Sequence, residues 1–496
     1  MPTSPRRLAR LLAVTAVAAA ACAGGGSATA PGPTPAPTPP TTAPVPGAAA
    51  EAYLTTGNQA KLLTREPDPR IGADTAVAPG ATRIDVDEAT TYQEIVGFGA
   101  SITDASAYLI QTRMAAASRE ALLQELFGRD PGIGLSFTRL TIGASDFSRT
   151  HYSFDDVPRG ETDPTLARFS IAPNRADVLP VVQRALAINP KLAVMASPWS
   201  APGWMKTTDA LIKGTLRREA YPAFAEYLRR YVEAYAAEGV PIFALTVQNE
   251  PHFEPDDYPG MRLDPAQRAD FLKNHLGPLF AQRGVRTQIL DWDHNWDEPQ
   301  SPQAVLADTG ARRYVAGVAW HCYAGDVSAQ TTVRDAHPDK DVWFTECSGG
   351  EWATNWGDNL KFLTRTLIVG TTRGWARGVL FWNLALDRAH GPHLGGCGNC
   401  RGVVTIDQAT GAVTRNVEYY ALAHVSRFVR PGARRIASTS GVEGIESVAF
   451  RNADDGSKVL LAVNGGSADR PLVVRAGGRA FRFTLPAGAV VTFRWA

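Results

Sequence analysis

Two glutamates that follow apolar segments have the residue type and placement needed for general acid and nucleophile chemistry. Glu250 follows the apolar segment Phe243–Gln248 by two positions, and Glu346 follows Val342–Thr345 directly. A lone Glu usually forms an exposed ion pair. Two carboxyls at strand ends can instead share a pocket, where one protonates a leaving oxygen and the other attacks an anomeric carbon. A gap near about 5 Å would favour retention of configuration, and a wider gap would leave room for water and inversion.

Other apolar segments also end in polar or aromatic residues. Leu192–Ser197 leads into Trp199, Val315–Trp320 into His321, and Gly378–Phe381 into Trp382. Ten of the 11 tryptophans lie between Trp199 and Trp382, the part of the chain that contains these segment ends. A single Trp is typically half-buried packing. For Trp199 and Trp382 we predict a pocket wall, because flat indole faces suit the apolar faces of sugar rings.

Eight β-type segments, several separated by helical patterns such as Ala220–Glu238, position these residues. Parallel strands need helical crossovers, so the pattern predicts a (β/α)₈ barrel. The alternative is a doubly wound open sheet, which the missing G-x-G-x-x-G after the first strand disfavours. The eight segments are Glu94–Gly99, Phe137–Ile142, Leu192–Ser197, Phe243–Gln248, Thr287–Trp292, Val315–His321, Val342–Thr345 and Gly378–Trp382.

After about residue 427 the pattern changes to short alternating segments separated by Gly, Asp and Asn, which predict an accessory antiparallel β-sandwich module. Ala81–Val86 has the same character, so 81–92 is a candidate strand of that module. We place the barrel at 93–425 and the module at 426–496. The module segments are Val442–Phe450, Lys458–Val463, Pro471–Val474, Ala480–Leu485 and Val490–Trp495.

The chain begins with features of an exported protein. Three arginines precede the apolar run Leu11–Ala21, which predicts a signal peptide over 1–23. Ala21-Cys22-Ala23 fits signal cleavage, and a lipid anchor at Cys22 is the alternative. Residues 24–50 carry no charge and eight prolines between Pro31 and Pro46, which is typical of an extended, disordered spacer, either a tether or a leftover without function.

Overall composition excludes several classes of function. The chain has 496 residues with Lys+Arg 50 and Asp+Glu 49, a balance that argues against a nucleic-acid binder and against a polybasic membrane-surface protein. Outside the N-terminus no apolar run approaches the roughly 20 residues of a transmembrane span. The sequence predicts no particular oligomeric state.

Several motifs resemble glycoside hydrolase family 30, the glucosylceramidase-related retaining β-glycosidases. The resemblance covers about residue 80 to the C-terminus and excludes the leader and spacer. Its motifs are Gly97–Ala105, Ala196–Lys206, Val247–Pro251, Phe344–Gly349 and Trp382–Leu386.

The resemblance implies roles for individual residues. Glu250 takes the place of the acid/base and Glu346 that of the nucleophile, and Asn249 matches the residue that contacts the sugar 2-hydroxyl. Cys322 stands where the animal glucosylceramidases have Trp, which affects the aglycone side. The remaining substrate-binding matches are Asp104, Trp199, His321, Tyr323, Trp382 and, in a more divergent loop, Asn399.

Other clusters allow different interpretations, none of which implies a catalytic metal or an organic cofactor. His390, His393, Cys397 and Cys400 have zinc-like spacing, but a Cys397–Cys400 disulfide is favoured in an exported protein. Cys347 is interpreted as a small buried residue beside the site. Asp291, Asp293, His294 and Asp297 are interpreted as a solvated rim or pocket wall, since no calcium loop accompanies them.

These observations predict an exported retaining β-glycosidase that acts on β-glucosides. Glucosylceramide or a small β-glucoside is one substrate class, β-1,6-glucan is the other, and xylan is less favoured. The alternative from another class is a non-catalytic glycan-binding protein, which would have lost one of the two carboxylates. Both are present.

Overall fold

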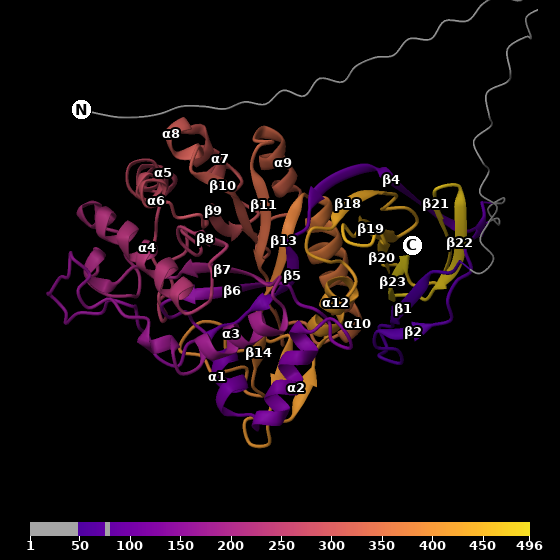
Figure 1. Ribbon diagram of the computed structural model, residues 1–496, viewed down its shortest axis with the longest axis horizontal. Coiled ribbons are helices and arrows are strands. Elements are labelled where there is room, and N and C mark those ends of the chain that lie inside the picture. Colours follow the sequence, from indigo (N-terminus) through magenta and orange to yellow (C-terminus); the bar gives the residue numbers. More distant parts are fainter. Residues whose placement is uncertain (1–47, 75–79) are drawn as a thin grey trace, which may run out of the picture. The chain divides into compact units, whose positions relative to one another are not determined.

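The computed structural model describes residues 48–74 and 80–496 (Figure 1). The predicted signal peptide and residues 24–47 of the predicted spacer lie outside this part of the chain. Eight parallel strands close into a barrel, which confirms the predicted (β/α)₈ architecture. In order around the barrel they are β5 (Gly97–Ser101), β6 (Phe137–Ile142), β7 (Ala193–Pro198), β8 (Ala244–Thr246), β9 (Gln288–Asn295), β10 (Val315–His321), β11 (Asp341–Glu346) and β13 (Ala376–Asn383).

The barrel interior is filled by one apolar side chain from each of seven strands. The strand β5 contributes glycine instead, because a Cβ on Gly99 would lie 1.9 Å from the carbonyl oxygen of Phe137 on β6. Filling the interior in this way makes a packed floor, on which polar side chains at the strand ends are held. The seven residues are Phe137, Met195, Ala244, Leu290, Ala319, Trp343 and Leu380.

Helices between the strands cover the barrel. The predicted Ala220–Glu238 helix is found as α4 (Tyr221–Ala237), whose buried face includes Phe224, Leu228 and Tyr231. Two π-helical segments, Leu272–Leu276 and Leu363–Gly370, interrupt the helical layer. The other α-helices are α1 (Asp104–Thr112), α2 (Ala116–Phe127), α3 (Val178–Ile188), α5 (Pro265–Phe271), α6 (Gly277–Arg283), α7 (Gln300–Ala307), α8 (Thr309–Arg312), α9 (Ser328–Ala336), α10 (Trp356–Phe362), α11 (Thr371–Arg373) and α12 (Val417–Ser426).

The accessory module is one ten-stranded sheet built from both ends of the described chain, with the purple N-terminal strands beside the yellow C-terminal ones in Figure 1. Pairing is antiparallel except between β4 and β21. In spatial order the strands are β2 (Thr64–Glu66), β1 (Glu51–Thr55), β23 (Val490–Trp495), β20 (Lys458–Asn464), β19 (Ile445–Arg451), β18 (Arg434–Ser438), β4 (Thr82–Glu94), β21 (Arg470–Ala476), β22 (Arg479–Leu485) and β3 (Gly72–Ala73).

Short strands brace the loops beyond β11 and β13. The strand β12 (Gly349–Gly350) pairs with β15 (Cys400–Arg401). The strand β16 (Val404–Ile406) pairs with both β14 (Ala385–Leu386) and β17 (Val413–Arg415). These pairs fix the loops on the same side of the barrel as the strand ends.

The structure differs from the sequence prediction at the start of the barrel and at the spacer. The predicted strand Glu94–Gly99 is divided, because Glu94 ends β4 and the backbone of Ile95 bonds instead to Gly432 and Ala433. The spacer was predicted through Ala50, but the backbone of Ala48 and Ala50 hydrogen-bonds to Ile71 and Pro69. Ala48–Ala50 therefore belongs to the folded part.

No helix within residues 48–74 and 80–496 is both long enough and apolar enough to cross a membrane.

Candidate active site

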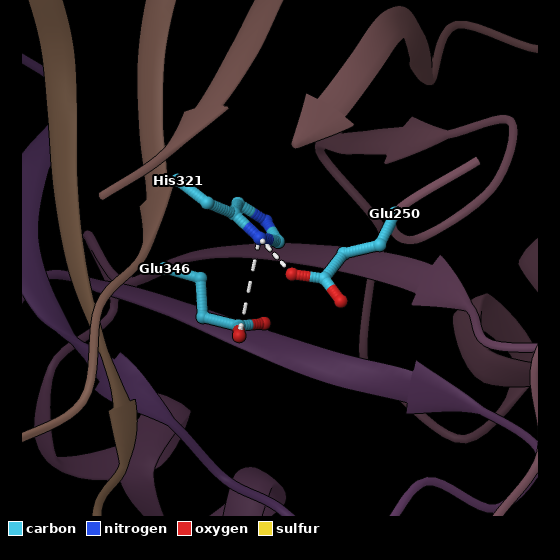
Figure 2. A group of neighbouring side chains, drawn as sticks. All are labelled: Glu250, His321 and Glu346. Atoms are coloured by element: carbon cyan, nitrogen blue, oxygen red, sulfur yellow. Dashed lines mark hydrogen bonds and ion pairs between the residues drawn. The ribbon is translucent and has the colours of Figure 1, made fainter. Parts of the chain in front are cut away.

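The carboxyl ends of the barrel strands bring the two predicted glutamates together (Figure 2). Glu250 follows β8, Glu346 ends β11, and His321, at the end of β10, lies between them. One carboxylate oxygen of each glutamate and a ring nitrogen of His321 all lie within 4.8 Å of one another. His321 Nδ1 is 3.1 Å from Glu250 Oε1 and 3.9 Å from Glu346 Oε1. The carboxyl groups thus have the short separation of retaining glycosidases, about 5 Å.

The backbone at Glu250 has an uncommon conformation. Its φ is 47°, and its N–H donates to the carbonyl oxygen of Asp293 at 3.0 Å. Non-glycine residues with positive φ are rare and persist where the surroundings hold them. Here the contact between the ends of β8 and β9 holds the carboxyl of Glu250 in the site.

Arg139 binds three of the polar residues at once, and its role was not predicted. It lies within the apolar strand β6 and is fully buried. Its guanidinium donates to Glu346 Oε2 at 2.5 Å, and to Asn249 Oδ1 and Asp293 Oδ2 at 2.7 Å each. An arginine inside a buried strand is itself a signal that could have been read, because a buried cation requires carboxylate partners.

Asp293 is the second functional residue that sequence reasoning missed. Leu290 faces the barrel interior, so a regular strand would turn both Asp291 and Asp293 outward. Trp292 and Asp293 instead have φ of 77° and 55°, and the backbone reversal turns Asp293 inward. There it accepts hydrogen bonds from Arg139, Ser197, Thr246, His321 and Thr345.

The sequence predicts a solvated rim or pocket wall for the cluster Asp291, Asp293, His294 and Asp297. The solvated-rim interpretation is wrong for two of its members. Asp291 and Asp293 are fully buried and bound by different arginines, Arg268 and Arg139. His294 lines the cavity, in agreement with a pocket wall. Asp297 is exposed.

A cavity of about 710 Å³ opens above the glutamates. Trp199 and Trp382, both predicted as walls, line it and stack with ring centroids 5.1 Å apart. The Arg139 guanidinium lies 4.7 Å from the Trp199 ring centroid. Toward solvent the cavity is lined by exposed aromatic side chains, Phe253, Tyr323 and Trp352. The site therefore has a buried inner end and an open outer end.

The predicted residues on this wall are brought together. Tyr323 donates its hydroxyl to Glu346 Oε1 at 2.9 Å, and Asn249 lines the cavity beside Glu250. His321 is buried behind both glutamates and hydrogen-bonds Asp293 Oδ1 at 3.0 Å. Each of these contacts restricts the orientation of a carboxyl group.

Asp104, His321 and Asn399, also predicted to bind substrate, do not line this cavity. Asp104 begins α1, and its carboxylate accepts from the side chain and backbone of Arg149. Asn399 is exposed in the loop before β15. The local motif did not indicate that Arg149 would bind Asp104.

Four of the cysteines considered in the sequence analysis form two disulfides, Cys397 with Cys400 and Cys322 with Cys347. The first pair confirms the disulfide that was favoured over a zinc site, since bonded sulfurs are not zinc ligands. Cys347 is buried beside the site, as predicted, but its disulfide with Cys322 was not predicted. This second disulfide joins the ends of β10 and β11, directly beside His321 and Glu346.

The charges of the site are coupled. Burial would lower the pKa of His321, but the surrounding carboxylates of Glu346, Asp293 and Glu250 raise it to about 9. Burial and then the charge of Glu250 hold the pKa of Glu346 above its ordinary value, against the effects of His321 and Arg139. Burial also acts to raise the pKa of Glu250, but the hydrogen bond from His321 and nearby positive charges bring it below its ordinary value.

Glu250, His321 and Glu346 have a spacing that would suit a metal ion. However, His321 keeps its proton at neutral pH and Arg139 supplies a further positive charge in contact with Glu346. These cations already compensate the carboxylates and would repel a metal cation.

Two family models match this chain. The glycosyl hydrolase family 30 TIM-barrel domain matches residues 95–429, and the family 30 beta sandwich domain matches residues 432–493. The chain belongs to glycosyl hydrolase family 30. This family 30 protein is accordingly a glycoside hydrolase, and the predicted resemblance is confirmed.

Relatives of this family 30 hydrolase include endo-1,6-beta-D-glucanases and glucosylceramidases. An endo-1,6-beta-D-glucanase of Neurospora crassa is 34% identical over 84% of this chain and 88% of its own. Putative glucosylceramidase 1 of Caenorhabditis elegans is 30% identical over 88% and 89%. A solved endo-beta1,6-glucanase superimposes with a TM-score of 0.82 at 32% identity, covering 90% of this chain and 99% of its own.

Proposed function

We propose that this family 30 protein hydrolyses β-glucosidic bonds by double displacement, with Glu346 as nucleophile and Glu250 as acid/base. The observation that carries the proposal is the approach of the two carboxyl groups to within 4.8 Å beneath one cavity. At this separation a carboxylate reaches the anomeric carbon itself, and no water fits between.

The surrounding donors support this division of roles. Glu346 receives hydrogen bonds from Arg139 and Tyr323, which favour its ionised form against the effect of burial and orient it for attack on C1. Glu250 has only His321 as a side-chain donor in the described part of the chain, and it lies open to the cavity. It is thus the carboxyl that is free to exchange a proton with a departing oxygen.

The electrostatic interaction between the two glutamates sets the protonation state of Glu250 in each step. A bound sugar excludes water, which strengthens the effect of burial and raises the pKa of Glu250 so that it carries the proton it donates. Formation of the glycosyl ester removes the charge of Glu346. Without that repulsion the pKa of Glu250 falls again, and Glu250 then takes a proton from the attacking water.

As substrate we propose β-1,6-linked glucan. Supporting this choice, the relatives named endo-1,6-beta-D-glucanase reach 34% identity and the solved endo-beta1,6-glucanase has a TM-score of 0.82. The exposed aromatic side chains Phe253 and Trp352 at the outer end of the cavity provide room and contact area for a further sugar. Glucosylceramide is the second candidate, favoured by the relatives named glucosylceramidase at 28–31% identity.

A substrate panel tests the proposal. Purified protein is incubated with aryl β-glucosides, β-1,6-glucan, xylan and glucosylceramide, and the first-formed anomer is identified by NMR. We expect turnover of β-1,6-glucan with a β-anomeric product. Faster turnover of glucosylceramide would favour the second candidate, and an α-anomeric first product would contradict double displacement.

Two variants test the roles of the glutamates. Glu346→Ala should lose turnover by about 10⁴-fold or more while keeping the fold, and azide should restore activity with a glycosyl azide as product. Glu250→Ala should lose less on aryl glucosides with good leaving groups, because these need no protonation. Wild-type turnover by either variant would contradict the assignment.

We further propose export of the protein, with soluble secretion or lipid attachment at Cys22 as the two routes. Support comes only from the sequence of residues 1–23. Mass spectrometry of the mature N-terminus tests it. Cleavage after residue 23 indicates secretion, a lipidated Cys22 indicates anchoring, and an intact Met1 in the cytoplasm contradicts export.

A further inference from the structure

Lys206 is a buried cation that the proposed function does not use. It follows the short helical turn Gly203–Met205 beyond β7, and its side chain is fully buried. It does not line the cavity that contains Glu250 and Glu346. Burial lowers the pKa of Lys206 to about 7, and no carboxylate in residues 48–74 and 80–496 forms an ion pair with it. A buried cation without such a partner lowers stability unless other groups bind it.

Three oxygen acceptors from two loops surround the ammonium group of Lys206. Its Nζ donates to the carbonyl oxygen of Leu211 at 2.6 Å, to that of Gly260 at 2.7 Å and to Ser200 Oγ at 2.8 Å. Ser200 and Leu211 belong to the loop after β7, and Gly260 belongs to the loop after β8. An ammonium has three N–H donors, so these acceptors use all of them. Lys206 therefore ties the two loops together.

The loop after β8, residues 251–263, forms much of the outer cavity wall. The N–H of Gly260 donates to the carbonyl oxygen of Leu211 at 3.1 Å, which adds a backbone bond beside that of Lys206. A Cβ on Gly260 would lie 2.3 Å from Pro255 Cδ, so the tied end of the loop packs directly against the lining segment. The lining residues of this loop are Phe253, Pro255, Asp256, Asp257 and Tyr258.

The loop after β7 carries part of the inner cavity wall. Ser200 directly follows Trp199, which lines the cavity and stacks on Trp382. The bonds to Ser200 and to Gly260 start from the same ammonium group. The position of the outer wall is thereby set relative to the tryptophan pair.

We propose that Lys206 is a positioning residue for the leaving-group side of the site, because it holds the loop after β8 against the Trp199 wall. The inference rests on the proposed function, since it needs a glycoside in this cavity. The sugar attacked by Glu346 occupies the inner end, and the part beyond the scissile bond extends along the loop after β8. Loss of the tie should weaken binding of that part and leave the inner end unchanged.

The test compares Lys206→Met with a matched control, Lys340→Met. Lys340 is also largely buried and donates to the carbonyl oxygen of Arg312, but it precedes β11 at the end of the barrel opposite the site. Assays are run at about pH 5.5, where Lys206 is charged. Lys206→Met should raise KM for β-1,6-glucan by about 10-fold or more, with kcat within about three-fold. For an aryl β-glucoside kcat/KM should fall by no more than about three-fold, and Lys340→Met should change neither substrate by more than about two-fold.

Two further measurements distinguish positioning from a general loss of stability. In hydrogen exchange, peptides from residues 251–263 should exchange about 10-fold faster in Lys206→Met than in wild type, and at the wild-type rate in Lys340→Met. In calorimetry, affinity of Lys206→Met for 1-deoxynojirimycin, a glucose-shaped iminosugar that fits the inner end, should stay within about two-fold of wild type.

Lys206→Gln is the second variant, for the case that methionine prevents folding. Its amide keeps two N–H donors on a shorter side chain, so it should raise KM for β-1,6-glucan by about three-fold or more with the same selectivity. If wild type prefers glucosylceramide, the KM comparison is made with that substrate, whose ceramide occupies the same outer end.

Three outcomes would overturn the inference. They are an equal loss on the long substrate and the aryl glucoside, a parallel loss of iminosugar affinity, and the same rise of KM in Lys340→Met. Failure of the proposed function is distinct, since wild type would then turn over no substrate of the panel.

Discussion

Two buried Arg–Asp pairs lie on opposite faces of β9, and they differ in how completely the aspartate is bound. On the inner face Asp293 pairs with Arg139, and both of its oxygens accept further hydrogen bonds. On the outer face Asp291 pairs with Arg268 from α5, but its Oδ2 has no hydrogen-bond partner among residues 48–74 and 80–496. Both pairs are fully buried. The inner pair is one part of a network that reaches Glu346, and the outer one ties the helical layer to the strand.

The contrast shows that burying an ion pair does not by itself make an active site. A buried pair seldom adds stability over apolar residues, but losing one partner leaves an uncompensated charge. The outer pair should therefore matter for folding alone. The inner pair should matter for chemistry too, because Arg139 and Asp293 set the charge and orientation of Glu346 and His321.

Replacing the arginine of each pair by methionine should give the largest difference between the inner and outer pairs. Arg139→Met removes the strongest donor to Glu346 and should lower kcat/KM on an aryl β-glucoside by about 10³-fold. Arg268→Met should lower the free energy of unfolding by about 3–5 kcal/mol, while kcat/KM of the folded protein stays within about three-fold. Denaturant unfolding and steady-state kinetics measure the two effects. Equal loss of activity in both variants would remove the distinction between the faces.

Replacing the aspartate of each pair by asparagine should give the same contrast in kcat/KM, with a smaller effect. Asp293→Asn keeps the shape of the side chain but removes the charge that Arg139 and His321 both contact, so kcat/KM should fall by about 10²-fold. Asp291→Asn should leave kcat/KM nearly unchanged. If Asp293→Asn retained wild-type kcat/KM, the inner network would be structural.

His321 provides a pH test of the inner network. Its pKa of about 9 lies above the ordinary value near 6.5, so its proton stabilises the fold fully below about pH 6.5 and this contribution is lost as pH rises through 9. The Tm of wild type should fall more steeply between pH 7 and 10, by a few degrees, than that of His321→Gln. Parallel curves of Tm against pH for wild type and His321→Gln would show that the proton on His321 does not contribute to stability.

His424 should show the opposite and smallest effect. It is buried on α12, between hydroxyl groups of Thr55 on β1 and Thr492 on β23, and burial lowers its pKa to about 3. Because the folded state resists its protonation, stability present above about pH 6.5 is lost as pH falls toward 3. His424→Gln should flatten this decline of Tm by a few degrees. A steeper decline in the variant would contradict the assignment.

Much of the fold could be predicted because it depends on local patterns. Apolar segments indicated all eight barrel strands. The alternation after residue 427 indicated five of the ten strands of the module, and Ala81–Val86 indicated a sixth. The strands β1, β2, β3 and β18 were not predicted. The strand β1 pairs with β23 at the other end of the chain, and such long-range pairing leaves no periodic signal.

The sequence by itself determined the two glutamates, because a carboxyl at the end of a buried strand, or a few residues beyond it, lies where polar side chains collect at the barrel end. Only the tertiary structure decided what surrounds them. Arg139 and Glu346 are distant in sequence and meet because β6 and β11 enclose one interior. Positive φ at two residues turns Asp293 inward, and Lys206 ties the loops after β7 and β8 together. These contacts depend on backbone direction and on chain segments far apart, and neither is encoded in residue type or spacing.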